Sequence, residues 1–297
     1  MATTVNCSCD GPIELDEYVQ WVDENVDVQD QSSLLESASK LLMLSKNRYL
    51  LTRIVDTSLK SMNDLGAQAG NQYSDSTFLL VGNYRQKRKD FFLRMNVWRE
   101  PRMRGGTVEY EKRLYSYGLP HDHNFDFLTV GYYGPGYRTR IYEYDASKVM
   151  GYIPERIDLH FLEETTLPVG KLMFYRNGVD VHEQAPPESL SISLNLIVQT
   201  PQNISRQQYY FDIEGQAISQ YGDGAIGRHL ALIELAGDIG NADTAEVLEY
   251  IGKNYPDPRE RAAALKAFYK LAPGESERVK AIIFADKSEV VRNVVFE

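Results

Sequence analysis

The sequence predicts an α+β protein in which a central β-barrel lies between two helical segments. Apolar residues recur at three- and four-residue steps near the N-terminus, short β-rich segments fill the middle, and helical spacing returns after Tyr221. Strands grouped between groups of helices are typical of this class and not of alternating βαβ units. We expect helices in 1–76, the barrel in 77–215 and further helices in 216–297.

Composition limits the classes of function. The 297 residues can build a core without disulfides, and the formal net charge of −10 argues against a nucleic-acid partner. No apolar run approaches the roughly 18 residues that span a bilayer, and no secretory leader is evident. We therefore expect a cytoplasmic protein without a membrane partner, in which Cys7 and Cys9 are reduced or incidental.

The N-terminal segment has a helical pattern from Ile13 to about Met62, with Asp30 available as an N-cap. The pattern predicts two or three amphipathic helices. From Thr77, β-rich segments such as Phe91–Trp98 alternate with Gly- and Pro-containing turns, which indicates a sandwich or barrel.

The C-terminal segment contains two similar stretches, 257–268 and 286–295, each with an acidic start and an Arg ahead of an apolar stripe. At a period of about thirty residues, the stretches resemble HEAT-type helical repeats. Such helices are expected to cap the barrel or to present a surface to a protein partner.

A candidate metal site begins at His121-Asp122-His123, ahead of an apolar strand. Side chains two residues apart on an extended chain point to the same face, so the two imidazoles can hold one ion. Phe125 and Phe127 continue that face as an apolar wall.

His182 is the predicted third ligand, because a closed barrel can bring its strand opposite the first. Three ligands on one face leave positions open for substrate, water or dioxygen. His160 and His229 are interpreted as buried, hydrogen-bonded core histidines and not as ligands.

The two histidine-containing segments resemble the two motifs of the cupin superfamily, the double-stranded β-helix proteins. The first motif is His-x-His followed by a Gly turn. The second is Pro-x-Gly followed by a later His and an alternating strand. Within the cupins they are similar to the three-histidine iron thiol dioxygenases of the cysteine dioxygenase type. The chain departs from that pattern, since Phe127 and Leu128 stand where the first motif carries a Glu, and 193–197 lacks the expected His and Tyr. A 2-oxoglutarate oxygenase fits less well, because His123 replaces its acidic ligand.

Four further residues are candidates for the surroundings of the metal, three of them for the catalytic pocket. Tyr142 and Tyr175 are possible pocket tyrosines, although tyrosines in sheets more often serve packing. The guanidinium of Arg94 could bind a substrate carboxylate through two parallel hydrogen bonds, or it could form a cross-strand ion pair. Asn195 could orient an imidazole or simply face out of the sheet.

The resemblance and the three histidines together predict a metal-dependent oxidoreductase, with a non-haem Fe(II) dioxygenase acting on a small or amino-acid-like molecule as the leading reading. Imidazole suits Zn, Mn, Ni and Cu as well, so a cupin lyase or isomerase remains open. The alternative class is a cupin that binds a ligand and presents its C-terminal helices to a partner protein or to a second copy.

Overall fold

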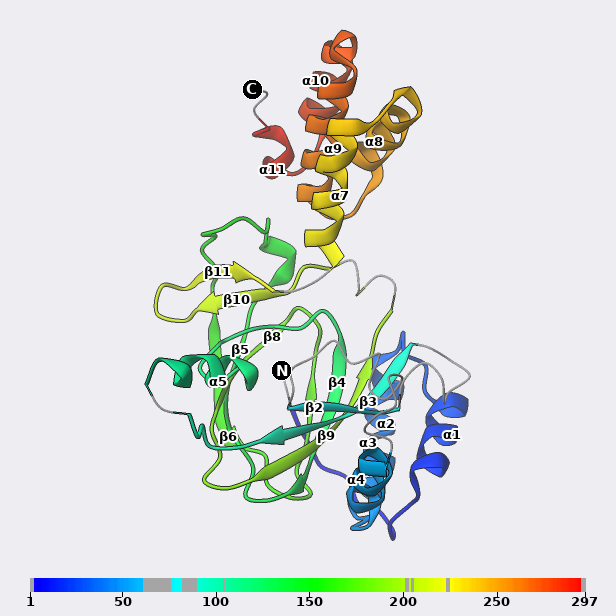
Figure 1. Ribbon diagram of the computed structural model, residues 1–297, viewed down its shortest axis with the longest axis vertical. Coiled ribbons are helices and arrows are strands. Elements are labelled where there is room, and N and C mark those ends of the chain that lie inside the picture. Colours follow the sequence, from blue (N-terminus) through cyan, green and yellow to red (C-terminus); the bar gives the residue numbers. More distant parts are fainter. Residues whose placement is uncertain are drawn as a thin grey trace. The chain divides into compact units, whose positions relative to one another are not determined.

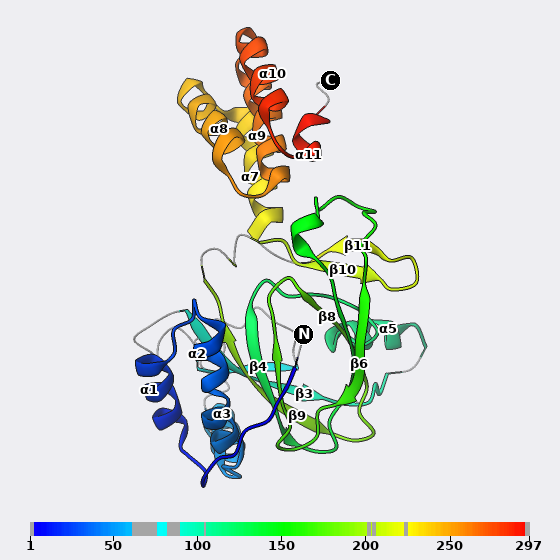
Figure 2. The ribbon, with the colours of Figure 1, turned by 180° about the vertical axis from the view of Figure 1, so that it is seen from behind.

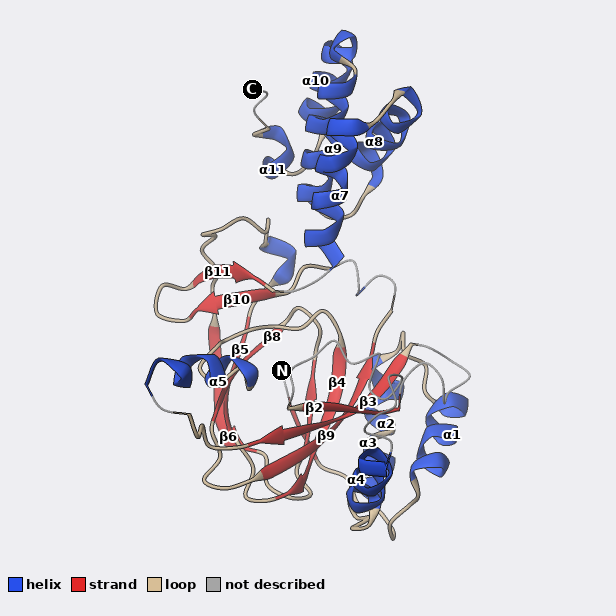
Figure 3. Cartoon of the chain, viewed as in Figure 1, coloured by secondary structure: helices blue, strands red, loops and turns tan. Residues whose placement is uncertain are grey.

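A computed structural model of the protein describes residues 3–60, 76–81, 90–103, 105–200, 203, 206–222 and 225–294. The chain forms two compact units, Met1–Tyr144 with Leu159–Thr200 and Asp145–Asp158 with Pro201–Glu297. Helices and antiparallel sheets occur together, as Figure 3 shows, so the predicted mixed class is confirmed. No helix within the described residues is long and apolar enough to cross a membrane.

The first unit is built on a six-stranded sheet in which every neighbouring pair of strands is antiparallel (Figure 1). Its order is β1-β7-β4-β9-β3-β2. The strands are β1 (Thr3–Val5), β2 (Thr77–Val81), β3 (Phe91–Trp98), β4 (Asp126–Tyr133), β7 (Leu172–Tyr175) and β9 (Ser191–Val198).

A second, three-stranded sheet in the same unit places β5 (Arg138–Glu143) between β6 (His160–Thr166) and β8 (Asp180–Ala185). From β6 to β9 successive strands alternate between the two sheets. Residues far apart in the sequence are thereby brought into one core, in which Ile141 of β5 packs with Phe127 of β4 and Tyr175 of β7. The short helix α5 (Val108–Leu114) also belongs to this unit.

Four helices follow β1, one or two more than the sequence pattern predicts. They are α1 (Leu15–Asn25), α2 (Gln31–Glu36), α3 (Ala38–Ser45) and α4 (Leu50–Lys60). The extra break falls at Ser37, which ends α2 and precedes α3. Asp30 caps α2 as predicted, since its carboxylate accepts a hydrogen bond from the Ser32 backbone N–H.

The two faces of the six-stranded sheet serve different purposes. On β9, Leu194 and Leu196 pack with Leu41 of α3 and other helix residues in one core. Figure 2 shows α2 and α3 beside the strands of this sheet. Asn195 and Ile197 alternate with them and point inward, toward the three-stranded sheet. The helices and the sheet therefore share one core, although the sequence pattern placed them in separate segments.

The second unit combines the hairpin of β10 (Tyr209–Asp212) and β11 (Ala217–Tyr221) with the C-terminal helices. Helices follow Tyr221, as the sequence predicts, and bury a common apolar core. They are α7 (Ala225–Ile239), α8 (Ala242–Asn254), α9 (Pro258–Leu271), α10 (Ser276–Ala285) and α11 (Glu289–Arg292). Their HEAT-like character stays a prediction.

The two similar stretches of the C-terminal segment are joined by an ion pair. Arg261 of α9 donates two hydrogen bonds to the Asp286 carboxylate, at 2.8 and 2.9 Å. Burial alone would raise the pKa of Asp286, but Arg261 and the backbone N–H of Ser288 hold it below its usual value. The ionised form of Asp286 therefore stabilises the fold.

Asp286→Asn is expected to lower the free energy of unfolding by about 1.5 to 3 kcal/mol at pH 7, the range for a hydrogen bond to a charged group. The folded-state pKa lies below the unfolded one, so the stabilisation is complete above about pH 4 and is lost as the pH falls through the folded-state value. Urea unfolding at pH 7 and pH 3 tests this, with the exposed Glu246→Gln as control. An equal loss at both pH values would contradict the prediction.

Candidate metal centre

The histidine pair lies beside β8 because the backbone of His121 bridges that of His182. Each backbone N–H donates to the other residue's carbonyl, at 3.1 and 2.9 Å. The carbonyl of His123 accepts a 2.7 Å bond from the Gly178 N–H in the turn between β7 and β8. Main-chain hydrogen bonds thus hold the His121–His123 segment along the strand that carries the third histidine.

The three imidazoles converge through their Nε2 atoms. Nε2 of His182 lies 3.2 Å from Nε2 of His121 and 3.1 Å from Nε2 of His123. Metal–nitrogen bonds of about 2.1 Å at angles of 90° to 109° place two ligand nitrogens about 3.0 to 3.4 Å apart. The cluster that the sequence predicts is therefore present, and its spacing fits a single divalent ion.

The protonation of the imidazoles suits this role. Burial lowers the pKa of His121 to about 4, against a weaker opposing effect of its hydrogen bond to Leu119. Burial, the neighbouring imidazoles and Arg94 lower the pKa values of His123 and His182 well below the usual range. Nδ1 of His121 lies 2.7 Å from the Leu119 carbonyl, which favours a proton on Nδ1 and a free lone pair on Nε2.

Aromatic rings surround the cluster. Phe125 stacks on His123 with ring centroids 4.5 Å apart, and Phe127 meets the same imidazole edge-on at 5.3 Å. The ring centroids of Tyr175 and His182 lie 4.9 Å apart, and the Tyr175 ring stacks on that of Phe127. The apolar wall predicted from Phe125 and Phe127 is present, and it limits the access of bulk water to the imidazoles.

Arg94 is buried on the inward face of β3, and its guanidinium carbon lies 5.7 Å from the Phe125 ring centroid. Its register partner on β9 is Asn195, which in turn pairs with Thr129 of β4. Within the described part of the chain, Asn195 Nδ2 and Asn96 Oδ1 are buried without a hydrogen-bond partner. The interior beside the histidines is thus polar and cationic, and can take a hydrogen-bonding anion.

The structure places the two candidate tyrosines differently. Tyr175 lies against the imidazole of His182, and burial raises the pKa of its phenol well above the usual value. Tyr142 does not face the cluster. Its neighbour Ile141 is the register partner of His182, so strand alternation turns Tyr142 to the other side, where it meets Phe161.

Asp126, the acid nearest the missing Glu of the first motif, is not part of the cluster. Its carboxylate accepts bonds from the backbone N–H and the side-chain amide of Asn177, at 2.7 and 2.9 Å. Asn177 precedes Gly178, the donor to the His123 carbonyl. Asp126 therefore clamps the turn that holds His123.

Gln184 is a site residue that the sequence reading did not single out. Its amide nitrogen lies 3.1 Å from Nδ1 and 3.3 Å from Nε2 of His182. The sequence does indicate this position, because Gln184 lies two residues after His182 on the same strand and therefore shares its face. The adjacent acid, Glu183, faces away from the cluster, and its carboxylate lies 3.8 Å from the Arg140 guanidinium.

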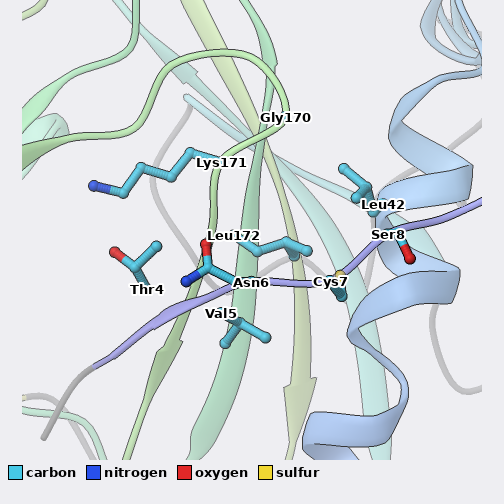
Figure 4. Close-up of a pocket in the computed structure, with 9 residues that line it drawn as sticks. All are labelled: Thr4, Val5, Asn6, Cys7, Ser8, Leu42, Gly170, Lys171 and Leu172. Atoms are coloured by element: carbon cyan, nitrogen blue, oxygen red, sulfur yellow. The ribbon is translucent and has the colours of Figure 1, made fainter.

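A separate groove of about 610 Å³ lies along β1 and the residues that follow it (Figure 4). It is lined by residues 4–8, Leu42 of α3 and residues 170–172, and none of the three histidines contributes to it. Burial, followed by the nearby Cys9, raises the pKa of the Cys7 thiol. A protonated thiol is a poor nucleophile and metal ligand, so this groove lacks the donor chemistry of the histidine cluster.

Comparisons with known proteins give distant structural likeness only. No protein-family model matches the chain, and no curated sequence matches it significantly. A chain from crystal structures of the DMSP lyases RdDddP and RnDddQII is 12% identical with a TM-score of 0.28, covering 46% of this chain and 52% of its own. RmlC from Streptococcus suis in complex with dTDP-D-xylose is 11% identical with a TM-score of 0.23, covering 37% and 45%.

Ethanolamine utilization protein Q from Salmonella typhimurium is 10% identical with a TM-score of 0.23, covering 41% of this chain and 67% of its own. The chain thus spans about half the length of the DMSP lyase chain to which it is similar.

Proposed function

We propose that the first unit is a cupin-type metal-binding domain and that it is an enzyme, a non-haem Fe(II) oxygenase acting on a small acid. One observation carries the proposal: His121, His123 and His182 converge through their Nε2 atoms at 3.1 to 3.2 Å inside an apolar wall. Neutral imidazoles this close, with lowered pKa values, are the donor set for one divalent ion.

The chain's own residues have distinct roles in this proposal. The histidines hold the ion, which when it is Fe(II) supplies the oxygen chemistry. Phe125 and Phe127 exclude water from the imidazoles, and the Tyr175 phenol stays protonated and packs against His182.

The substrate class follows from the polar interior. Arg94 is buried close enough to the cluster that its charge lowers the pKa values of all three histidines. A guanidinium binds a carboxylate through two parallel hydrogen bonds. The buried amides of Asn195 and Asn96 offer further hydrogen bonds. A small carboxylic acid with a second polar group, such as an amino or hydroxy acid, matches this lining.

Arg94→Leu is expected to weaken the binding of a small acid by about ten- to a hundredfold, because a charge-assisted hydrogen bond contributes about 1.5 to 3 kcal/mol. Thermal-shift titration with succinate, glycine and cysteine measures the effect in the metal-loaded protein. The exposed Arg99→Leu serves as control. Unchanged affinity in Arg94→Leu for every acid that the wild type binds would contradict the assignment.

Oxygen consumption tests the reaction class. The protein is loaded anaerobically with Fe(II) and mixed with amino acids, hydroxy acids and thiol acids in an oxygen electrode cell. Uptake that depends on one of these substrates and is lost in His182→Ala supports the oxygenase. Substrate turnover without oxygen uptake would contradict the oxygenase assignment and favour a lyase or isomerase that uses Zn, Mn, Ni or Cu as a Lewis acid.

A further inference from the structure

Two buried polar side chains on the three-stranded sheet have no role in the proposed function. Gln184 of β8 and Thr139 of β5 are register partners, and they lie on the same face as His182. Gln184 is 4% exposed and Thr139 is 1% exposed. The Tyr175 phenol lies beside the Thr139 hydroxyl, whereas Gln184 Oε1 has no hydrogen-bond donor among the described residues. A buried acceptor without a donor costs free energy, so this position points to a bound polar group.

The imidazole of His182 sets the orientation of the Gln184 amide. The amide nitrogen lies 3.1 Å from Nδ1 and 3.3 Å from Nε2 of His182. A nitrogen in the ring plane at these distances would collide with the carbon between the two ring nitrogens. The NH₂ group therefore lies over the ring, where the π electrons attract its hydrogens.

Turning the Gln184 amide by 180° would not satisfy it. The oxygen would then lie against the π electrons of the ring, and the NH₂ group would lack an acceptor. The amide oxygen thus faces away from the imidazole, and it needs a hydrogen-bond donor that the described residues do not supply.

The charges around the histidine cluster decide which donor fits. Arg94 is buried, with its guanidinium carbon 5.7 Å from the ring centroid of Phe125, which stacks on His123. One substrate carboxylate balances this one cation. The acids next to the histidines in sequence have other partners, since Asp122 accepts from Tyr144, Asp126 from Asn177 and Asp180 from Arg176.

An ammonium group on the substrate would therefore add a second buried cation beside these engaged acids, which is costly. An uncharged hydroxyl needs only a neutral acceptor, and the Gln184 amide oxygen is one. The Thr139 hydroxyl can act as donor or acceptor and lies on the neighbouring strand.

We infer that Gln184 and Thr139 are specificity-determining residues that bind the hydroxyl group of a hydroxy acid, whose carboxylate is held by Arg94. The inference rests on the proposed small-acid site and narrows its substrate class. The substrate hydroxyl donates to Gln184 Oε1, and its oxygen accepts from the Thr139 hydroxyl. An acid without the hydroxyl leaves these buried groups unpaired and binds more weakly.

Matched ligands measure this preference. Propionate, alanine, L-lactate, D-lactate and 3-hydroxypropionate share the carbon chain and the carboxylate and differ in the second polar group. In calorimetric titration of the Zn(II)-loaded wild type, at least one hydroxy acid is expected to bind about ten- to a hundredfold more tightly than propionate and alanine. This is the size of effect that an unpaired buried acceptor produces.

Two variants and a control assign the preference to these side chains. Gln184→Leu has a similar size without the acceptor, and it is expected to abolish the preference for the hydroxy acid while leaving propionate binding unchanged. Thr139→Val replaces the hydroxyl by a methyl group and is expected to lower the same preference. Glu183→Gln changes the neighbouring side chain, which faces Arg140, and is expected to retain the full preference.

The outcomes separate this inference from the proposed function. A hydroxy-acid preference that persists in Gln184→Leu, or in Thr139→Val if only that variant folds, would show that the hydroxyl binds the metal instead and would overturn the inference. Equal or tighter binding of propionate or alanine by the wild type would overturn it as well. A wild type that binds none of these acids would overturn the proposed small-acid site itself.

Discussion

His182→Ala is expected to reduce the metal content of the protein from about one ion per chain to nearly none. Loss of a partner that only orients a ligand imidazole already costs about 10- to 100-fold in affinity, and removal of the ligand itself should cost more. His182 is also the centre of the cluster, since both short Nε2 contacts involve it. Elemental analysis of protein purified without chelator or an affinity metal column measures the effect.

His160→Ala is the matched control. His160 lies on β6 of the same unit and is exposed, not in the core as the sequence suggested, and the side chain of His229 is likewise 47% exposed. Removal of the His160 imidazole should therefore leave the metal content unchanged. Equal metal in the wild type and in the folded His182→Ala protein would show that the ion is bound elsewhere.

Gly131→Ala is expected to lower the free energy of unfolding by about 3 kcal/mol or more, at the upper end for overpacking a core. A Cβ atom at Gly131 would lie 2.1 Å from the Pro168 carbonyl oxygen and 2.6 Å from its carbon. These are backbone atoms, and hydrogen bonds fix the approach, since Gly131 donates to Lys171 and accepts from Gly170 at 3.0 and 2.8 Å. Neither segment can yield without breaking them.

Urea unfolding of Gly131→Ala is compared with that of Gly11→Ala. No atom lies within 4 Å of a Cβ at Gly11, and its φ is not in the left-handed region, so that change should stay within about 0.5 kcal/mol. A mild effect in both variants would mean that the Pro168 turn moves freely, contrary to the packing described here.

The first two ligands of the metal cluster could be predicted because residues close together in the sequence define them. The two-residue spacing of His121 and His123 fixes a shared face in any extended segment, and an aromatic face follows directly after it. His182 needed a further step, the expectation of a closed β structure, because 59 residues separate it from His123. The structure meets that expectation with the direct backbone bridge between His121 and His182.

Features that depend on strand register could not be read from the sequence. Tyr142 and Tyr175 look equivalent in the sequence, yet pairing of Ile141 with His182 turns Tyr142 away, while Tyr175 lies at the imidazole. The inward row that joins Arg94 with Asn195 likewise exists only once β3 has paired with β9. A shift of one residue in either register would send these side chains to the other face.

The N-terminal helices show a different limit. Their apolar spacing correctly predicts helices between Ile13 and Lys60, the last described residue of this segment, but the break at Ser37 carries no Gly or Pro. The buried residues of these helices share one core with β4 and β9. Local patterns do not encode such tertiary contacts, which contribute most of the stability of helices in proteins.

The most direct test of the central claim is X-ray absorption at the edge of whichever metal the purified wild type retains or takes up. We expect the imidazole scattering pattern of about three histidine ligands at about 2.0 to 2.1 Å, with no sulfur scatterer. Sulfur among the nearest ligand atoms would show that a cysteine or methionine binds the ion. That result, a ligand set without imidazole, or no uptake of Fe(II), Zn(II) or Mn(II) would contradict the assignment to His121, His123 and His182.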